Sequence, residues 1–266
     1  MRILSFIMAC IMLIGCTHCF AQEENTMNYT DPKALPTLQG MPDLFTFQDG
    51  SKVETIEDWQ RRRAEIKGLY EYYLYGYLPD KAGETLSYTL TPLKDGTGYD
   101  MLITVAAGGK EASFSVTVTL PQTEVPEKGY PYFIEYIWAW PGMPKVTQNQ
   151  QMAAARGYAG IAYDPSQCAA DNSTFTGAYY TLYPYYTKNP QDKTGVLLAW
   201  AWGVSKIIDA MEQGAAAELG INAAYSLVGG VSRFGKSVAV AGAYDERIKV
   251  VIPSCSGAGG LGMLRY

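Results

Sequence analysis

The chain has 266 residues and a formal net charge of −5, with 48% hydrophobic and 18% charged residues. This is the composition of a globular protein, and the length suffices to bury a full core in one large domain. The negative charge argues against nucleic acid or an anionic membrane surface as a partner.

The N-terminus has the features of an export signal. Arg2 forms a short positive region, and the apolar run that follows is too short to span a bilayer. Cleavage at the lipobox-like "LIGC" would leave Cys16 as a lipidated N-terminus, whereas cleavage after Ala21 would be an ordinary signal-peptide cut. An uncleaved anchor is the third alternative. We therefore expect residues 1–21 to be a signal peptide and the protein to be periplasmic, lipid-anchored or secreted in a bacterium.

The sequence contains a single histidine, His18, which lies in or beside this leader. After either cleavage it is removed or left on a flexible tether. We therefore do not expect His18 to act as a catalytic base.

Residues 22–45 are polar and contain prolines, which is typical of a linker. The segment 55–79 has apolar residues at helical spacing, with Thr55 or Asp58 as cap and Pro79 as its end. β-rich runs follow, and the alternation in the third predicts a half-buried antiparallel strand. These runs cover residues 86–93, 100–108, 112–120 and 130–138.

From residue 148 onward, helix and strand patterns alternate. The expected helices cover residues 149–157, 193–214 and 234–245, and the expected strands cover 158–163, 225–232 and 248–254. Alternation of this kind indicates a parallel, doubly wound sheet with an antiparallel section at its start. The predicted fold class is α/β, in one domain over residues 46–266.

Beyond the leader, the cysteines are Cys168 and Cys255, too few for a disulfide scaffold or a zinc site. We interpret them as two buried thiols rather than a pair. The 21 tyrosines and 5 tryptophans suit stacking on sugar rings, but they suit a boundary between core and surface equally well.

Ser232 lies between a buried strand and a helix of small residues, in the pattern G-x-S-x-x-G formed with Gly230 and Gly235. This context is typical of the turn that presents the nucleophile in α/β-hydrolases, although the usual spacing is G-x-S-x-G. A nucleophilic serine normally needs a histidine. In α/β-hydrolases the acid and the histidine follow the serine. We therefore expect both beyond Tyr266, with this chain as the front part, or fragment, of a longer enzyme.

The string "GVSRFGK", followed by "AGAYDERIKVVIPSCSGAGG", resembles the glucuronoyl esterases, carbohydrate esterase family fifteen, whose corresponding turn reads like "GCSRxGK". Three further stretches are similar to that family: "DWQRRRAEIKGLYEYYLYGYLP", "AAARGYAGIAY" and "LLAWAWGVSKIIDAME". The resemblance runs from about residue 40 to the last residue. It implies an α/β-hydrolase three-layer sandwich.

The resemblance implies three site residues. Ser232 matches the nucleophile, Arg233 matches the arginine that stabilises the oxyanion, and Lys236 matches the lysine that binds hydroxyls of the glucuronoyl ring. A fixed guanidinium stabilises developing charge without reorganising. Lys236 lies one helical turn from the serine and can face the same pocket.

Each of these residues also has a structural interpretation. Ser232 could be an ordinary turn serine, and Arg233 and Lys236 could be solvated charges, although a helix start disfavours positive charge. A serine–lysine dyad is disfavoured because its spacing is S-x-x-K. Trp138 and Trp140 are expected to line or pack rather than to bind substrate.

Two positions depart from the family pattern. Val231 stands where family members often have a disulfide-bonded cysteine, and Cys255 stands where some members carry the catalytic carboxylate. Members without that carboxylate take their acid from a later loop. The triad acid is therefore not identified within the 266 residues.

The implied reaction is hydrolysis of the ester between 4-O-methylglucuronic acid on glucuronoxylan and a lignin alcohol. It proceeds by attack of Ser232, an acyl-enzyme and release by water, without a metal or organic cofactor. One alternative is an acetyl or feruloyl esterase acting on the same polymers. Another is a non-catalytic or vestigial carbohydrate-binding homologue. Without histidine and acid, we expect the chain by itself to be inactive.

Overall fold

The computed structural model describes residues 29–37, 40–139, 142, 146–185 and 193–262. The expected signal peptide and both candidate cleavage sites lie outside these residues. The chain divides into two units after Thr37. In the first, Pro32–Ala34 forms a 3-10 turn whose cap, Asp31, accepts the Lys33 N–H at 2.8 Å.

The second unit is built on a seven-stranded sheet in its described part, with the order β1-β2-β3-β5-β4-β6-β7. The strands are β1 (Thr85–Pro92), β2 (Gly98–Ala107), β3 (Lys110–Thr119), β4 (Tyr130–Tyr136), β5 (Ala159–Tyr163), β6 (Ile221–Val231) and β7 (Ile248–Ser254). The pairs β1–β2, β2–β3 and β3–β5 are antiparallel. The pairs β4–β5, β4–β6 and β6–β7 are parallel. The predicted parallel sheet with an antiparallel start is therefore confirmed.

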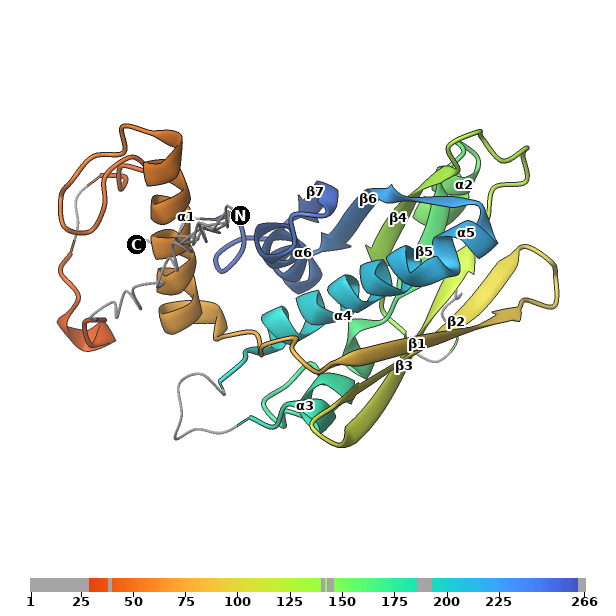
Figure 1. Ribbon diagram of the computed structural model, residues 1–266, viewed down its shortest axis with the longest axis horizontal. Helices are drawn as coiled ribbons and strands as arrows, with labels where there is room; N and C mark the ends of the chain where they lie inside the picture. The colour runs from red at the N-terminus through yellow and green to blue at the C-terminus, as the bar shows by residue number, and fades with distance from the viewer. Residues whose placement is uncertain (1–28, 38–39, 140–141, 143–145, 186–192, 263–266) are drawn as a thin grey trace, which may run out of the picture. The chain divides into compact units, whose positions relative to one another are not determined.

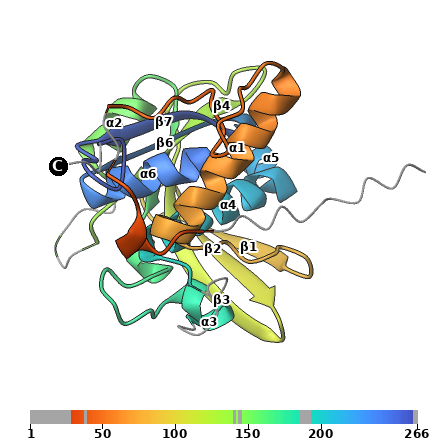
Figure 2. The ribbon, with the colours of Figure 1, turned by 90° about the vertical axis from the view of Figure 1, so that its left-hand side faces the viewer.

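The described α-helices are α1 (Ile56–Tyr70), α2 (Gln148–Ala154), α3 (Ala178–Leu182), α4 (Val196–Ala210), α5 (Ala216–Leu219) and α6 (Arg233–Tyr244). Among them, α2 and α6 cover the parallel strands. The helix α6 contacts α4, β6 and β7, whereas α2 contacts β4 and β5. Figure 2 shows α2 and α6 on opposite sides of β6 and β7. This three-layer arrangement is the predicted α/β fold.

The first long helix begins where the sequence predicts and ends earlier. Thr55 caps α1 in a capping box, since its side chain accepts from the Asp58 N–H and the Asp58 carboxylate accepts from the Thr55 N–H. A π-helical turn, Glu71–Tyr75, continues it to Gly76. Gly76 has φ +77°, and a Cβ there would lie 1.6 Å from the Lys193 carbonyl oxygen. Gly76, not Pro79, therefore terminates the helix.

The largest fully buried side chains of the described structure are aromatic. Trp200 and Trp202 are 1% and 2% exposed, and Tyr132, Tyr163 and Tyr179 are fully buried. The Tyr163 hydroxyl donates to the Trp200 carbonyl at 3.0 Å, so its polar end is satisfied inside the protein. Packing in the core therefore explains part of the high aromatic content.

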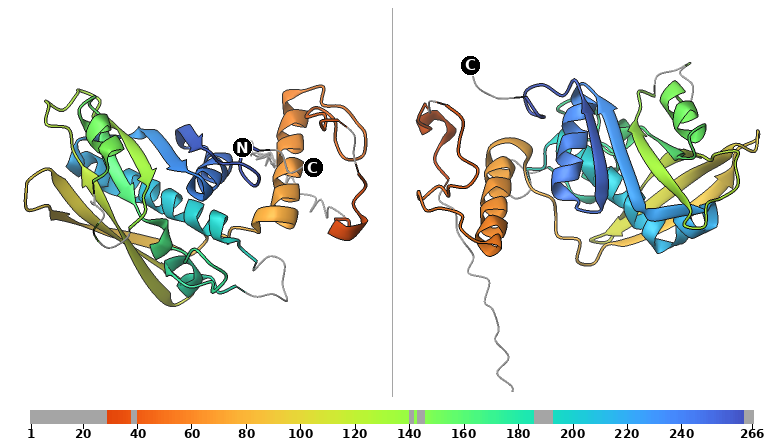
Figure 3. Two further views of the ribbon diagram at one scale, coloured as in Figure 1. Left: turned by 180° about the vertical axis from the view of Figure 1, so that it is seen from behind. Right: turned by 90° about the horizontal axis from the view of Figure 1, so that it is seen from above.

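The strand β7 lies at one edge of the described sheet and β1 at the other (Figure 3). The central residues of β7, Val250, Val251 and Ile252, are 39–45% exposed. In parallel sheets such residues are usually covered on both faces. The sheet edge next to the predicted site is therefore apolar and accessible in the described structure.

Candidate active site

Ser232 occupies the sharp turn between β6 and α6. The strand ends at Val231, and Ser232 is the N-cap residue of α6, which begins at Arg233. Because β6 pairs in parallel with both β4 and β7, the turn lies at the carboxyl end of a central strand. The predicted position of Ser232 is confirmed.

The turn holds Ser232 in an unusual backbone conformation. Its φ of +60° and ψ of −123° are rarely adopted by a residue with a side chain. The Ser232 N–H donates to the Ser254 carbonyl at 2.9 Å, and the Ser232 carbonyl accepts from the Lys236 N–H at 3.1 Å. The side chain is exposed. The turn therefore presents the hydroxyl to solvent on a backbone that is tied to both β7 and α6.

Two glycines permit this close approach of strand and helix. A Cβ on Gly230 would lie 3.0 Å from the Phe234 backbone carbon, and one on Gly235 would lie 2.5 Å from the Ser254 carbonyl oxygen. Because backbone atoms cannot rotate away, neither position accepts a larger residue without displacement. This explains physically why glycines flank the serine at these positions.

The Arg233 side chain lies over an aromatic platform next to the turn. Its guanidinium carbon is 5.1 Å from the centre of the Trp138 ring, and Nη1 forms an ion pair with Asp171. Trp138 is itself stacked on the buried Phe234, with ring centres 4.0 Å apart. Arg233 is therefore held by two defined partners from other loops. Trp140 lies outside the described residues.

The Lys236 side chain extends to the loop that follows β7. Its Nζ donates to the carbonyls of Ser256 and Ala258. The same loop is held by the Tyr75 hydroxyl, which donates to the Gly259 carbonyl at 3.1 Å. Two of the three ammonium donors therefore shape the glycine-rich loop. The binding of sugar hydroxyls by Lys236 stays a prediction.

A cavity of about 340 Å³ lies beside the turn, lined by residues that include Trp138, Gly230, Val231 and Ser254. Glu135, which is 8% exposed, also lines it and accepts from Asn149 Nδ2 at 2.7 Å and from the Thr147 hydroxyl. Glu135 was not predicted as a site residue, and the one sequence feature that could have indicated it is its place near the end of a buried strand.

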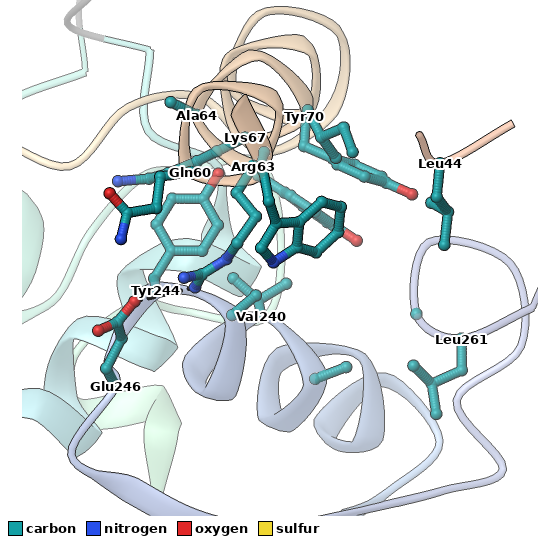
Figure 4. A pocket seen from close by; sticks show the side chains of 16 residues that line it. Leu44, Gln60, Arg63, Ala64, Lys67, Tyr70, Val240, Tyr244, Glu246 and Leu261 are labelled. Atoms are coloured by element: carbon teal, nitrogen blue, oxygen red, sulfur yellow. Dashed lines mark hydrogen bonds and ion pairs between the residues drawn. The ribbon is translucent and has the colours of Figure 1, made fainter. Parts of the chain in front are cut away.

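A larger cavity of about 710 Å³ lies between α1 and α6 and does not include the predicted site residues. Figure 4 shows Arg63 pointing from α1 toward Glu246, with Leu44 and Leu261 at one side. The Arg63 and Glu246 charges are paired at 2.9 Å. None of Ser232, Arg233 and Lys236 lines this cavity, so it is separate from the predicted site.

The cysteines differ from the expectation of two buried thiols. Both are free, but Cys168 is buried whereas Cys255 is exposed, with φ +50°. Cys255 follows the edge strand β7, where no described element covers it. Burial raises the pKa of the Cys168 thiol to about 12. Cys168 therefore belongs to the core.

The described residues offer a serine, a guanidinium and a backbone turn, which together suit nucleophilic attack on a carbonyl carbon. They contain no histidine, and no group of three or more His, Cys, Asp or Glu side chains among them is arranged to hold a metal ion. In the same residues, no helix has the length and apolarity needed to cross a membrane.

Comparison with known proteins identifies a consistent set of relatives. Residues 103–266 match the family model described as "Glucuronyl esterase, fungi". A "Multidomain esterase" of Ruminococcus flavefaciens is 42% identical over 251 residues, which is 91% of this chain and 31% of that protein. A "4-O-methyl-glucuronoyl methylesterase" of Phanerochaete carnosa is 31% identical over 97% of this chain and 60% of its own length.

A solved structure gives the same result for the fold. The carbohydrate esterase family 15 glucuronoyl esterase from Caldicellulosiruptor kristjansonii is 43% identical, with a TM-score of 0.76 over 88% of this chain and 60% of that one. The present chain spans less than two thirds of each of these three relatives.

Proposed function

We propose that Ser232 is the nucleophile of a carboxylic-ester hydrolase that acts on 4-O-methylglucuronoyl esters. The premise is that the chain belongs to the glucuronoyl esterase family. The observation that carries the proposal is the turn at Ser232. It combines a positive φ, an exposed side chain and an adjacent arginine at the end of a central parallel strand. A polymer such as glucuronoxylan, with its lignin–carbohydrate esters, is the proposed natural substrate.

The reaction begins when Ser232 Oγ attacks the ester carbonyl carbon and its proton passes to a base. The carbonyl oxygen then carries negative charge, which the Arg233 guanidinium and the N–H groups at the start of α6 stabilise. Collapse of this intermediate breaks the bond to the alcohol oxygen, which takes the proton from the base and leaves, while the glucuronoyl group stays as an ester on Ser232. Water then attacks this ester and gives a proton to the base, which passes it to the Ser232 oxygen as the free glucuronic acid leaves.

Lys236 supports the substrate side of this site. Lys236 lies one turn along α6 from the serine, and its ammonium donates to the carbonyls of Ser256 and Ala258. The two hydrogen bonds to these carbonyls also limit where the third N–H of the ammonium can point, and we assign that N–H to a ring hydroxyl of the glucuronoyl group. The loop that follows β7 thereby becomes one wall of the sugar site.

The test is an assay in which imidazole serves as an external base, because the described residues contain no histidine. The 266-residue protein is incubated with the methyl ester of 4-O-methylglucuronic acid, with and without imidazole, beside Ser232→Ala. General-base assistance is typically worth about 10²–10⁴-fold, so imidazole should restore a rate that is slight without it. The rate above the Ser232→Ala control is the Ser232-dependent rate.

Equal rates for the wild type and Ser232→Ala would contradict the proposal. Acetylated and feruloylated xylo-oligosaccharides are assayed in parallel, since acetyl and feruloyl esterases are the alternative within the same chemistry. A Ser232-dependent rate on those esters alone would overturn the glucuronoyl assignment. Binding of the sugar without any Ser232-dependent rate would instead support a non-catalytic carbohydrate-binding protein.

A further inference from the structure

Arg233 is the first residue of α6, and this position does not by itself fix the conformation of its side chain. The positive end of the helix dipole disfavours a nearby cation. A long, rotamer-rich side chain in such a place extends into solvent unless specific partners hold it. Arg233 is 51% exposed, so burial alone does not fix it. An oxyanion-stabilising guanidinium nevertheless has to be in position before the charge develops.

The carboxylate of Asp171 supplies the missing partner. Its Oδ2 pairs with Arg233 Nη1, and Asp171 is 62 residues earlier in the chain, so the pair joins two separate loops. The guanidinium lies at the same time over the ring of Trp138. One anion and one aromatic face therefore constrain it from two directions, while its remaining N–H donors stay available to a substrate oxygen.

The loop that carries Asp171 is itself rigidly held. The Ala170 N–H donates to the Thr176 carbonyl at 2.9 Å, and the Thr174 N–H donates to the Asn172 side chain at 2.8 Å. Just before the loop, Trp200 Nε1 donates to the Ala169 carbonyl at 2.7 Å. Asp171 is therefore on an ordered loop fixed to the core.

Trp200 connects this loop to the aromatic platform. Its ring meets the Phe234 ring edge-on at 5.3 Å, and Phe234 is 3% exposed and stacked under Trp138. A single buried side chain therefore positions both the loop that carries Asp171 and the platform under the guanidinium. This shared support is what an incidental surface ion pair lacks.

We propose that Asp171 is a positioning residue that, together with Trp138, holds the Arg233 guanidinium beside Ser232 before substrate binds. The inference rests on the proposed function. Asp171 does not touch the ester; it acts by limiting where Arg233 can point. Its loss should therefore lower the turnover number more than it raises KM.

The first readout is the Arg233 side chain itself. In protein labelled with ¹⁵N-arginine, the Arg233 guanidinium signals are assigned by their absence in Arg233→Lys. An ion-paired guanidinium rotates slowly and gives resolved Nη–H signals. We expect these signals to be lost in Asp171→Asn and regained in Asp171→Glu. Unchanged Arg233 signals in Asp171→Asn would overturn the proposal, whether or not the protein hydrolyses esters.

The second readout is the Ser232-dependent rate in imidazole. Removal of an oxyanion donor costs about 10²–10³-fold and a misplaced one costs less, so we expect kcat of Asp171→Asn to fall about 10-fold with KM within about twofold. Asp171→Glu should recover part of that loss. A faster Asp171→Asn enzyme would mean that Asp171 withholds Arg233 from the substrate, which contradicts the proposal.

The matched control is Glu246→Gln, which removes an ion pair from Arg63, an arginine that is likewise 51% exposed. It should change neither the Arg233 signals nor the rate. Thermal unfolding of each variant shows whether the fold is intact. Absence of any Ser232-dependent rate in the wild type would refute the proposed function, while the Arg233 signals would still decide whether Asp171 holds the guanidinium.

Discussion

Replacement of Gly235 by alanine tests the close contact that forms the serine turn. The new Cβ would lie 2.5 Å from the Ser254 carbonyl oxygen and 3.1 Å from the Gly230 carbonyl oxygen. Cβ contacts below 3.0 Å are essentially never observed. The first turn of α6 therefore has to move by about half an ångström away from β7, the strand whose Ser254 carbonyl accepts the Ser232 N–H.

The magnitude follows from two opposing terms. Overpacking against rigid backbone costs about 1–3 kcal/mol, here at the upper end, and alanine regains about 1 kcal/mol of helix propensity. The net destabilisation is therefore about 2 kcal/mol, which corresponds to a fall in Tm of about 4–8 °C for a domain of this size. Displacement of the nucleophile should also lower the Ser232-dependent rate about 10-fold.

The assay is thermal and denaturant unfolding together with the imidazole-supported rate. The control is Gly242→Ala in the same helix, where the new Cβ would lie 2.4 Å from Val251 Cγ1, a side-chain atom rather than a backbone atom. Because Val251 is 39% exposed on the edge strand, its side chain can turn to another rotamer at a cost of about 0.5–1.5 kcal/mol, which the gain of about 1 kcal/mol in helix propensity offsets, so we expect a net change of less than about 1 kcal/mol. A Gly235→Ala protein as stable and as reactive as the wild type would refute this explanation of the turn.

Other predictions concern the buried charges and the thiols. Lys206→Met should lower the unfolding free energy in denaturant titrations by about 3–5 kcal/mol, because it leaves the buried Glu84 carboxylate without its lysine partner. Adding Glu84→Gln should recover part of this loss, and no recovery would show that the two charges are not coupled. Burial alone would raise the pKa of Asp245, but hydrogen bonds from Arg247 and Ser205 lower it from 3.8 to about 2, so stability present above pH 3.8 should be lost as the pH falls toward 2. The same titration of Asp245→Asn should lack that component, and an identical pH profile would contradict the assignment. Iodoacetamide followed by peptide mass spectrometry should modify Cys255 in the native protein and Cys168 only after unfolding, and early labelling of Cys168 would contradict its burial.

The elements that sequence reasoning located are those with a strong local signal. The run before Ser232 and the small residues after it identify β6, the turn and α6, because a buried parallel strand and an amphipathic helix have distinct patterns. The short helices α3 and α5 were not predicted. They have five and four residues, too few to establish a period.

The contacts of the site residues could not be predicted from the sequence for a different reason. Asp171 and Arg233 are 62 residues apart, and nothing local to "DNST" distinguishes a carboxylate that faces an arginine from one that faces water. Likewise, Lys236 was expected to face the sugar. Its contacts with Ser256 and Ala258 depend on how the loop after β7 folds back over α6. Tertiary contacts of this kind have no periodicity to detect.

The central claim is that Ser232 forms a covalent ester with the glucuronoyl group, and a direct measurement is the mass of the Ser232 peptide after acid quench. The protein is mixed with the methyl ester of 4-O-methylglucuronic acid in imidazole buffer, quenched within the first turnover and digested. The account predicts a 4-O-methylglucuronoyl adduct on Ser232 that forms together with one equivalent of methanol and is absent in Ser232→Ala. Methanol release without an adduct on Ser232, at a rate equal to that of Ser232→Ala, would contradict it.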